Sequence, residues 1–78
     1  MTRDEAQAAL VRMLIEKVRE DKYPSFTQME LIEESITPEL IEDYFEVLAE
    51  KVMGDENPSI QLMRRMQRVA HSLPSQAQ

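Results

Sequence analysis

The residues best suited to chemistry are four carboxylates spaced three and four apart along one predicted helix. These residues are Glu39, Glu42, Asp43 and Glu46. They share one helical face, because residues at these spacings are neighbours on a helix. Paired carboxylates can exchange protons with a substrate or hold a hard cation. A di-iron bundle would also need Glu-x-x-His pairs, which the sequence lacks. We therefore interpret the four as a solvated acidic face, a common role for charge runs on amphipathic helices.

The sequence has one histidine, His71, and no cysteine, so one chain can form neither a two-histidine metal site nor a thiolate site. A histidine near the end of a helix is favoured there as a cation beside the negative end of the helix dipole. The single glycine excludes a glycine-rich phosphate-binding loop. We expect a protein with no catalytic activity, no cofactor and no metal ion.

Charge is unevenly distributed along the chain, whose net charge at pH 7 is −6. Residues 1–56 carry six Lys and Arg against fifteen Asp and Glu, a balance of −9. Residues 57–78 carry three arginines and no acid, a balance of +3. The basic segment contains Arg64, Arg65 and Arg68, with His71 on the same helical face as Arg64 and Arg68. An acidic body with a basic C-terminal helix favours contacts between opposite charges.

From this charge pattern we predict a small protein-interaction module with an unidentified protein partner. The expected binding surface is the basic helix, with Arg64, Arg65 and Arg68 facing an acidic groove or helix. The acidic face of residues 39–46 would be the complementary surface. Contact between these faces of neighbouring copies would give weak self-association that salt weakens; otherwise we expect a monomer. The sequence leaves open whether the arginines pair within the chain.

The alternative function is that of a nucleic-acid-associated or transcription-linked regulator that uses the same basic helix. The second and third helices are joined tightly, as in a helix-turn-helix. The third helix, however, starts PELIEDYFE, with four acids and no base, so phosphates would repel it. Three arginines are a small basic surface on an otherwise acidic chain. Binding to nucleic acid is therefore disfavoured.

Four helices must position these residues, because apolar residues recur every three or four positions and not every two. We expect an all-α fold with helices at about 3–20, 26–34, 38–53 and 60–72. The expected N-terminal caps are Thr2, Ser25, Thr37 and Ser59. Glu5 and Gln28 complete capping boxes with the first two caps. Gly54 is expected in the left-handed conformation at the end of the third helix.

The predicted core faces follow from the same periodicity. The first helix has so broad an apolar face that we expect it to be central, with Ala6, Ala8, Leu10, Val11, Met13, Leu14, Ile15 and Val18 facing inward. The second should turn inward Phe26, Met29 and Ile32, with Leu31 beside them. The third should bury Leu40, Tyr44, Leu48, Val52, Ile41, Phe45 and Ala49. The fourth should turn inward Met63, Met66, Ala70 and Leu73, with Leu62 and Val69 alongside.

Two stretches of the chain resemble each other at an offset of 34 residues. LIEKVREDKYPSFTQM covers residues 14–29, LAEKVMGDENPSIQLM covers residues 48–63, and eight of the sixteen positions are identical. In each stretch a helix ends, Asp-x-x-Pro spans a turn, and Ser caps the next helix. Proline disfavours helix at the residue before it, and serine accepts from a free amide. We interpret the shared element as a turn, and the fold as two related helix-turn-helix units.

The first of these turns contains Tyr23, an aromatic residue that the second turn lacks. A loop aromatic can anchor a partner protein, or it can pack over the end of a helix. The segment from Asp21 to Ser25, which contains the KYPS loop, resembles with its flanking helices small uncharacterised helical proteins of actinobacterial type. This resemblance implies no activity.

The length predicts one helical domain at 1–73 and a disordered tail at 74–78. No run reaches the ~18 apolar residues that a membrane span needs, so we expect no membrane contact. The N-terminus lacks the basic start and apolar core of a secretory signal. We therefore expect a cytoplasmic protein.

Overall fold

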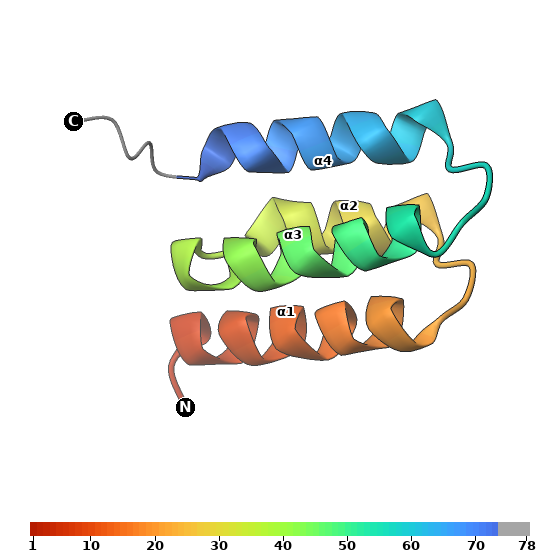
Figure 1. The fold of residues 1–78 in the computed structure, drawn as a ribbon. Helices are drawn as coiled ribbons and strands as arrows, with labels where there is room; N and C mark the ends of the chain where they lie inside the picture. Colours follow the sequence, from red (N-terminus) through yellow and green to blue (C-terminus); the bar gives the residue numbers. More distant parts are fainter. Residues whose placement is uncertain (74–78) are drawn as a thin grey trace.

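The computed structural model describes residues 1–73 and contains four α-helices (Figure 1). They are α1 (Arg3–Glu20), α2 (Phe26–Ser35), α3 (Pro38–Met53) and α4 (Ile60–Ser72). The all-α, four-helix prediction is confirmed, and only the end of α2 differs, by one residue. No strand occurs within residues 1–73. The tail predicted at 74–78 lies outside the described residues.

Side-chain caps fix where most of the helices begin. At α1 the Glu5 backbone N–H donates to Thr2 Oγ1 over 3.1 Å, and the Thr2 N–H donates to Glu5 Oε1 over 2.8 Å. Ser25 and Gln28 make the same reciprocal pair at α2. Ser59 accepts from the Leu62 N–H at α4. Thr37 occupies the cap position of α3 without a side-chain cap bond, and Pro38 starts that helix with its fixed φ.

Both copies of the Asp-x-x-Pro-Ser element form the same turn. Asp21 Oδ1 accepts from the Tyr23 N–H over 3.1 Å, and Asp55 Oδ1 accepts from the Asn57 N–H over 3.0 Å. With the serine caps, these bonds give each shared polar residue a structural role. That the two halves are copies of one unit stays a prediction.

The prediction for Gly54 is wrong. Its φ of −84° and ψ of −4° are right-handed, and its N–H continues the helical bonding to the Glu50 carbonyl. The chain leaves α3 without needing a left-handed residue, because the Asp55 turn follows at once. Glycine is therefore not required at this position by its backbone angles.

The helices pack as a chain of neighbours. α2 packs on α1, α1 on α3, and α3 on α4. Figure 1 shows α3 between α1 and α4, with α2 behind it. The central position expected for α1 is therefore shared with α3. The core consists of Val11, Ile15, Val18, Met29, Ile32, Leu40, Tyr44, Val47, Leu48, Leu62 and Val69.

Some predicted inward residues of α1 and α2 lie on the surface. Leu10 is 48% exposed and Met13 is 56% exposed, because α1 has neighbours on only part of its apolar face. Ala6 is exposed for the same reason, and Leu31 of α2 is 48% exposed. Val47, which neither predicted row of α3 included, is fully buried.

The fourth helix is rotated about its axis relative to the prediction. Met63 and Ala70 are exposed, whereas Leu62 and Val69 are buried. The rotation brings Arg65 to the inner side, where its side chain is 11% exposed. The inward face of α4 therefore combines aliphatic residues with one arginine.

No described helix is both long and apolar enough to cross a bilayer.

Candidate partner-binding surface

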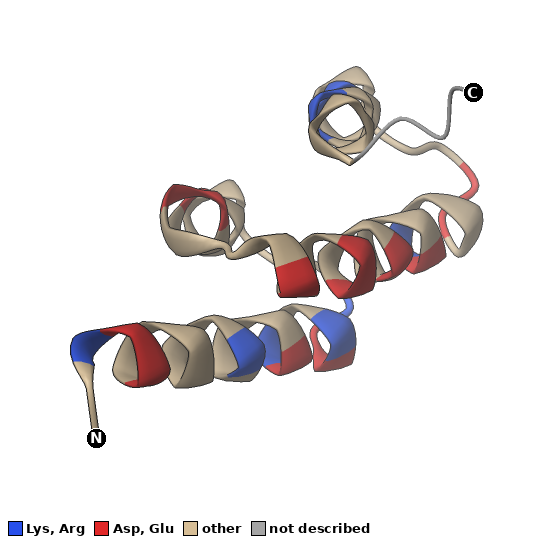
Figure 2. Ribbon diagram, turned by 90° about the vertical axis from the view of Figure 1, so that its left-hand side faces the viewer, with Lys and Arg blue, Asp and Glu red and all other residues tan. Residues whose placement is uncertain are grey.

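The basic and acidic surfaces predicted from the sequence are not brought together within one chain. Figure 2 shows the blue turns of α4 on the side of α2 and the red turns of α3 on the side of α1. Every member of the acidic face is exposed: Glu39, Glu42, Asp43 and Glu46. The backbone N–H of Glu39, followed by the Thr37 side chain, lowers the pKa of the Glu39 carboxyl. No pair within residues 1–73 joins this face to an arginine of α4.

Arg65 is bound inside the chain. Its Nη1 lies 2.7 Å from Glu33 Oε1 on α2, and its guanidinium carbon lies 5.0 Å from the centre of the Phe26 ring. Because the guanidinium is largely buried, this pair and the cation–π contact are shielded from solvent. Arg65 therefore attaches α4 to α2, although these two helices make no close backbone contact.

Glu33 uses its second oxygen to bind α3. The Tyr44 hydroxyl donates to Glu33 Oε2 over 2.6 Å, so one carboxylate joins α2, α3 and α4. Burial, followed by the bond to Glu33, raises the pKa of Tyr44. The described part of the chain holds no buried side-chain polar atom without a hydrogen-bond partner. The role of Glu33 could not be predicted from the sequence, since its partners lie eleven and thirty-two residues away.

This network predicts a stability that falls at alkaline pH. The raised pKa means that Tyr44 keeps its proton in the folded state while the unfolded chain ionises near pH ~10. Stability from this group is present below that pH and decreases above it, by up to about 1.4 kcal/mol per pH unit. Denaturant unfolding at pH 8 to 11 should show this slope, and Tyr44→Phe should remove it at a cost of about 1 kcal/mol at neutral pH.

The control is the exposed Tyr23, since the chain has only two tyrosines. Tyr23→Phe should leave the alkaline slope unchanged. If both variants keep the slope, Tyr44 is not its source, and folding does not raise the pKa of this residue.

Surface cavities follow the line between α2 and α4, which we call the α2–α4 groove. Its walls are formed by Glu30, Glu33 and Glu34 of α2 and by Arg64, Arg65 and Arg68 of α4. One cavity of about 400 Å³ contains Phe26, Gln61, Arg64, Arg65, Gln67 and Arg68. A second, of about 340 Å³, lies between the acids of α2 and the arginines of α4. The groove thus has a basic wall and an acidic wall.

A third cavity, of about 180 Å³, continues the groove to the end of α4. Its apolar lining is Ile36, Ile41, Tyr44 and Val69, and its polar lining is Glu33, Arg68 and Ser72. Arg68 lines all three cavities and is exposed, and it makes no ion pair within residues 1–73. Arg64 is likewise exposed and unpaired among these residues. His71 is exposed in the last turn of α4.

Tyr23 lies apart from the groove, in the turn between α1 and α2. It is 78% exposed, and the Lys22 ammonium is 5.6 Å from the centre of its ring. So exposed a ring does not pack over a helix end, and its role as a partner anchor stays a prediction. The two turns together border a cavity of about 410 Å³ that includes Lys22, Tyr23, Asn57 and Ser59.

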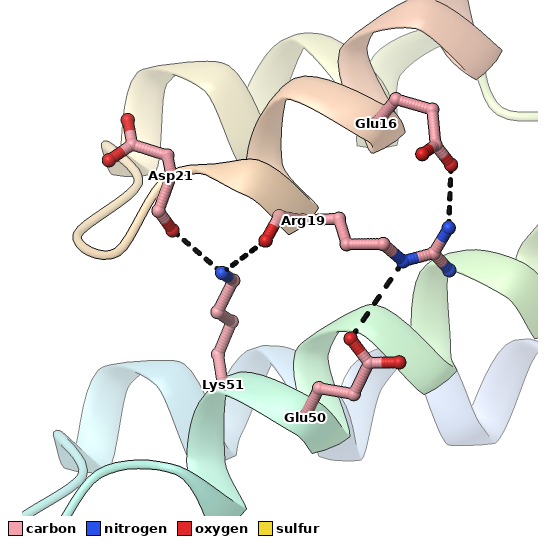
Figure 3. Close-up of polar contacts among 5 residues, drawn as sticks. All are labelled: Glu16, Arg19, Asp21, Glu50 and Lys51. Carbon is pink, nitrogen blue, oxygen red and sulfur yellow. Dashed lines mark hydrogen bonds and ion pairs between the residues drawn. The ribbon is translucent and has the colours of Figure 1, made fainter.

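A polar cluster that the sequence did not predict joins α1 to α3 (Figure 3). Lys51 Nζ donates to the Arg19 carbonyl over 2.7 Å and to the Asp21 carbonyl over 2.6 Å. The Arg19 guanidinium lies 2.6 Å from Glu16 and 3.8 Å from Glu50. Lysine thereby satisfies carbonyls that the end of α1 leaves free. The only sequence signal was the Glu-Lys-Val identity at residues 16–18 and 50–52.

Residues 1–73 contain no group of three His, Asp or Glu side chains arranged to hold a metal ion. No protein-family model matches the chain, and no curated protein or solved structure matches it either. The α2–α4 groove and the Tyr23 loop are therefore assigned from geometry alone.

Proposed function

We propose that the chain is a small protein-interaction module that binds a partner through the α2–α4 groove. The observation that carries this proposal is the state of the arginines of α4. Arg65 already contacts Glu33 and Phe26. Arg64 and Arg68 remain exposed and unpaired among the described residues, beside three cavities. Two cations beside preformed cavities, on a helix held by a satisfied polar network, provide a ready site for an acidic partner segment.

Arg65 has a supporting role in this proposal. It fixes the helix that presents Arg64 and Arg68, and its own donors already face Glu33. A test of binding should therefore leave Arg65 intact, because a change there alters the fold as well as the surface.

The test is an affinity co-purification from native lysate with wild type and with Arg64→Glu/Arg68→Glu. We expect the wild type to recover a protein partner that the variant loses, because glutamates at these two positions would repel an acidic segment. The charge-matched control is Arg3→Glu/Arg12→Glu, which changes two exposed arginines on α1. All three forms should give the same helical circular dichroism and the same thermal melt.

The outcomes separate the candidate functions. Equal recovery by wild type and both variants would show that the basic wall binds nothing, and the proposal would be wrong. Loss of nucleic acid alone would support the regulator alternative, whose affinity should fall log-linearly with salt. Loss in the α1 control as well would indicate a response to net charge and would contradict a site on α4.

A further inference from the structure

The last cavity of the α2–α4 groove has the size and lining of a site for one aromatic side chain. Its volume is about 180 Å³, and an apolar cavity of about 150 Å³ holds a benzene molecule. Ile36, Ile41 and Val69 supply apolar walls, and Arg68 and Ser72 are polar groups at the same cavity. Aromatic side chains in such cavities are frequent anchors of protein interfaces, because one ring removes a large apolar area from water.

The chain itself carries an exposed aromatic side chain. Tyr23 is 78% exposed on a turn held by the Asp21 side chain, so the ring is presented by a fixed backbone. Lys22 directly precedes Tyr23 in the sequence, and the acids Glu20 and Asp21 precede Lys22. The turn therefore presents one ring together with charges of both signs.

The charges along the α2–α4 groove complement those of the turn. Arg68 lines the last cavity and Arg64 lines the neighbouring one, so a turn seated here would bring its Glu20 and Asp21 carboxylates near the basic wall of the groove. Glu30 and Glu34 line the adjacent cavity as the acidic wall and match Lys22. A ring with an acid pair before it and one base beside it thus fits a groove with an arginine wall and a glutamate wall.

We propose that the Tyr23 turn of a second copy of this chain occupies the Arg68 end of the α2–α4 groove. This inference rests on the proposed function, since it names the occupant of the same groove. The two parts lie at opposite ends of the molecule, because the turn follows α1 while Ile36, Ile41 and Ser72 lie at the end of α2, the start of α3 and the end of α4 (Figure 1). The contact is therefore head-to-tail and produces open chains of copies rather than a closed dimer.

A mixing experiment by sedimentation velocity tests this geometry. Wild type should associate as its concentration rises, above the 9.1 kDa monomer. Tyr23→Ser removes the ring, and Arg68→Glu opposes it with the wrong charge, so each variant alone should associate about tenfold more weakly or not at all. In a mixture, the Arg68→Glu variant supplies an intact turn and the Tyr23→Ser variant supplies an intact groove. The two should therefore form a 1:1 dimer and no longer chain.

Salt provides a second readout on the same samples. Because screening shortens the reach of charges from ~10 Å at 0.1 M to ~3 Å at 1 M salt, wild-type association should weaken at high salt. The matched control is Arg12→Glu on α1, which should associate as the wild type does. Should either variant melt abnormally, Tyr23→Ala and Arg68→Ala replace it, since both side chains are exposed.

A wild type that stays monomeric over the whole concentration range overturns the inference. Association that persists in both single variants, or that ignores salt, also overturns it. A monomer that still recovers a protein partner through Arg64 and Arg68 refutes only the second copy as occupant and leaves the proposed function standing. A self-associating chain that recovers nothing else identifies the second copy as the partner.

Discussion

Arg65→Glu should lower the free energy of unfolding by about 3 kcal/mol, since breaking a buried ion pair by removing one partner costs about 3–5 kcal/mol. The lower end applies because Glu33 is 26% exposed. The variant places a second carboxylate against Glu33 and loses the contact with Phe26. A domain of 78 residues has roughly 4–12 kcal/mol of stability in total. Urea unfolding at pH 7 measures the change.

The neighbouring residue provides the matched control. Arg64→Glu makes the same chemical change one position away, on an exposed side chain without an ion pair within residues 1–73. Exposed substitutions of this kind change stability by about 0.5 kcal/mol or less. Equal losses in the two variants would contradict the structural role of Arg65, and the attachment of α4 would then depend on its apolar residues Leu62, Met66 and Val69.

The expected loss is large because little apolar surface attaches α4 to the rest of the molecule. Of its residues only Leu62 and Val69 are buried, each 8% exposed, and α3 is the helix that it packs against. Besides these two residues and the partly buried Met66, α4 is attached through Arg65, which contacts the Phe26 ring and the Glu33 carboxylate. The same carboxylate accepts from Tyr44 of α3. The polar network thus also determines which face of α4, and hence which arginines, the groove presents.

Local features of the fold were predictable from the sequence because their causes are local. The capping boxes at Thr2 and Ser25 and the proline at Pro38 act within a few residues, so the starts of the helices agree with the prediction. The two Asp turns are equally local. Gly54 is the exception, since the turn that follows α3 could end the helix without a left-handed residue.

The rotation of α4 could not be predicted from the sequence, because the periodicity of apolar residues places apolar side chains inside and charged side chains outside. On that basis Met63 and Ala70 belong inside and Arg65 outside. The observed order depends on Glu33, which lies thirty-two residues away and offers Arg65 a carboxylate. A long side chain with a partner can occupy an inner position that an aliphatic residue would otherwise take. For the same reason the sequence could not show that Arg65 is structural while Arg64 and Arg68 make no ion pair within residues 1–73.

Lys51→Met should lower the free energy of unfolding by about 2 kcal/mol, since each hydrogen bond from a charged group contributes about 1.5–3 kcal/mol and partial exposure reduces the sum. The ammonium donates to the Arg19 and Asp21 carbonyls, and methionine keeps most of the side-chain length without any donor. The end of α1 would lose its two hydrogen bonds to α3 (Figure 3). Thermal unfolding should show a decrease in Tm of roughly 8–16 °C for a domain of this size.

The repeated segment supplies the control for this lysine. Lys17 is the counterpart of Lys51 at the offset of 34 residues, with the same Glu and Val neighbours, but it is exposed. Lys17→Met should therefore change Tm by little, whereas two equal decreases would show that the contacts of Lys51 are not what stabilises the domain. Comparison of the two lysine variants therefore distinguishes an effect of the shared local sequence from an effect of the tertiary contacts. The Glu-Lys-Val pattern is the same in both copies, but only the second lysine comes to lie beside the free carbonyls of another helix, because α3 packs against the end of α1.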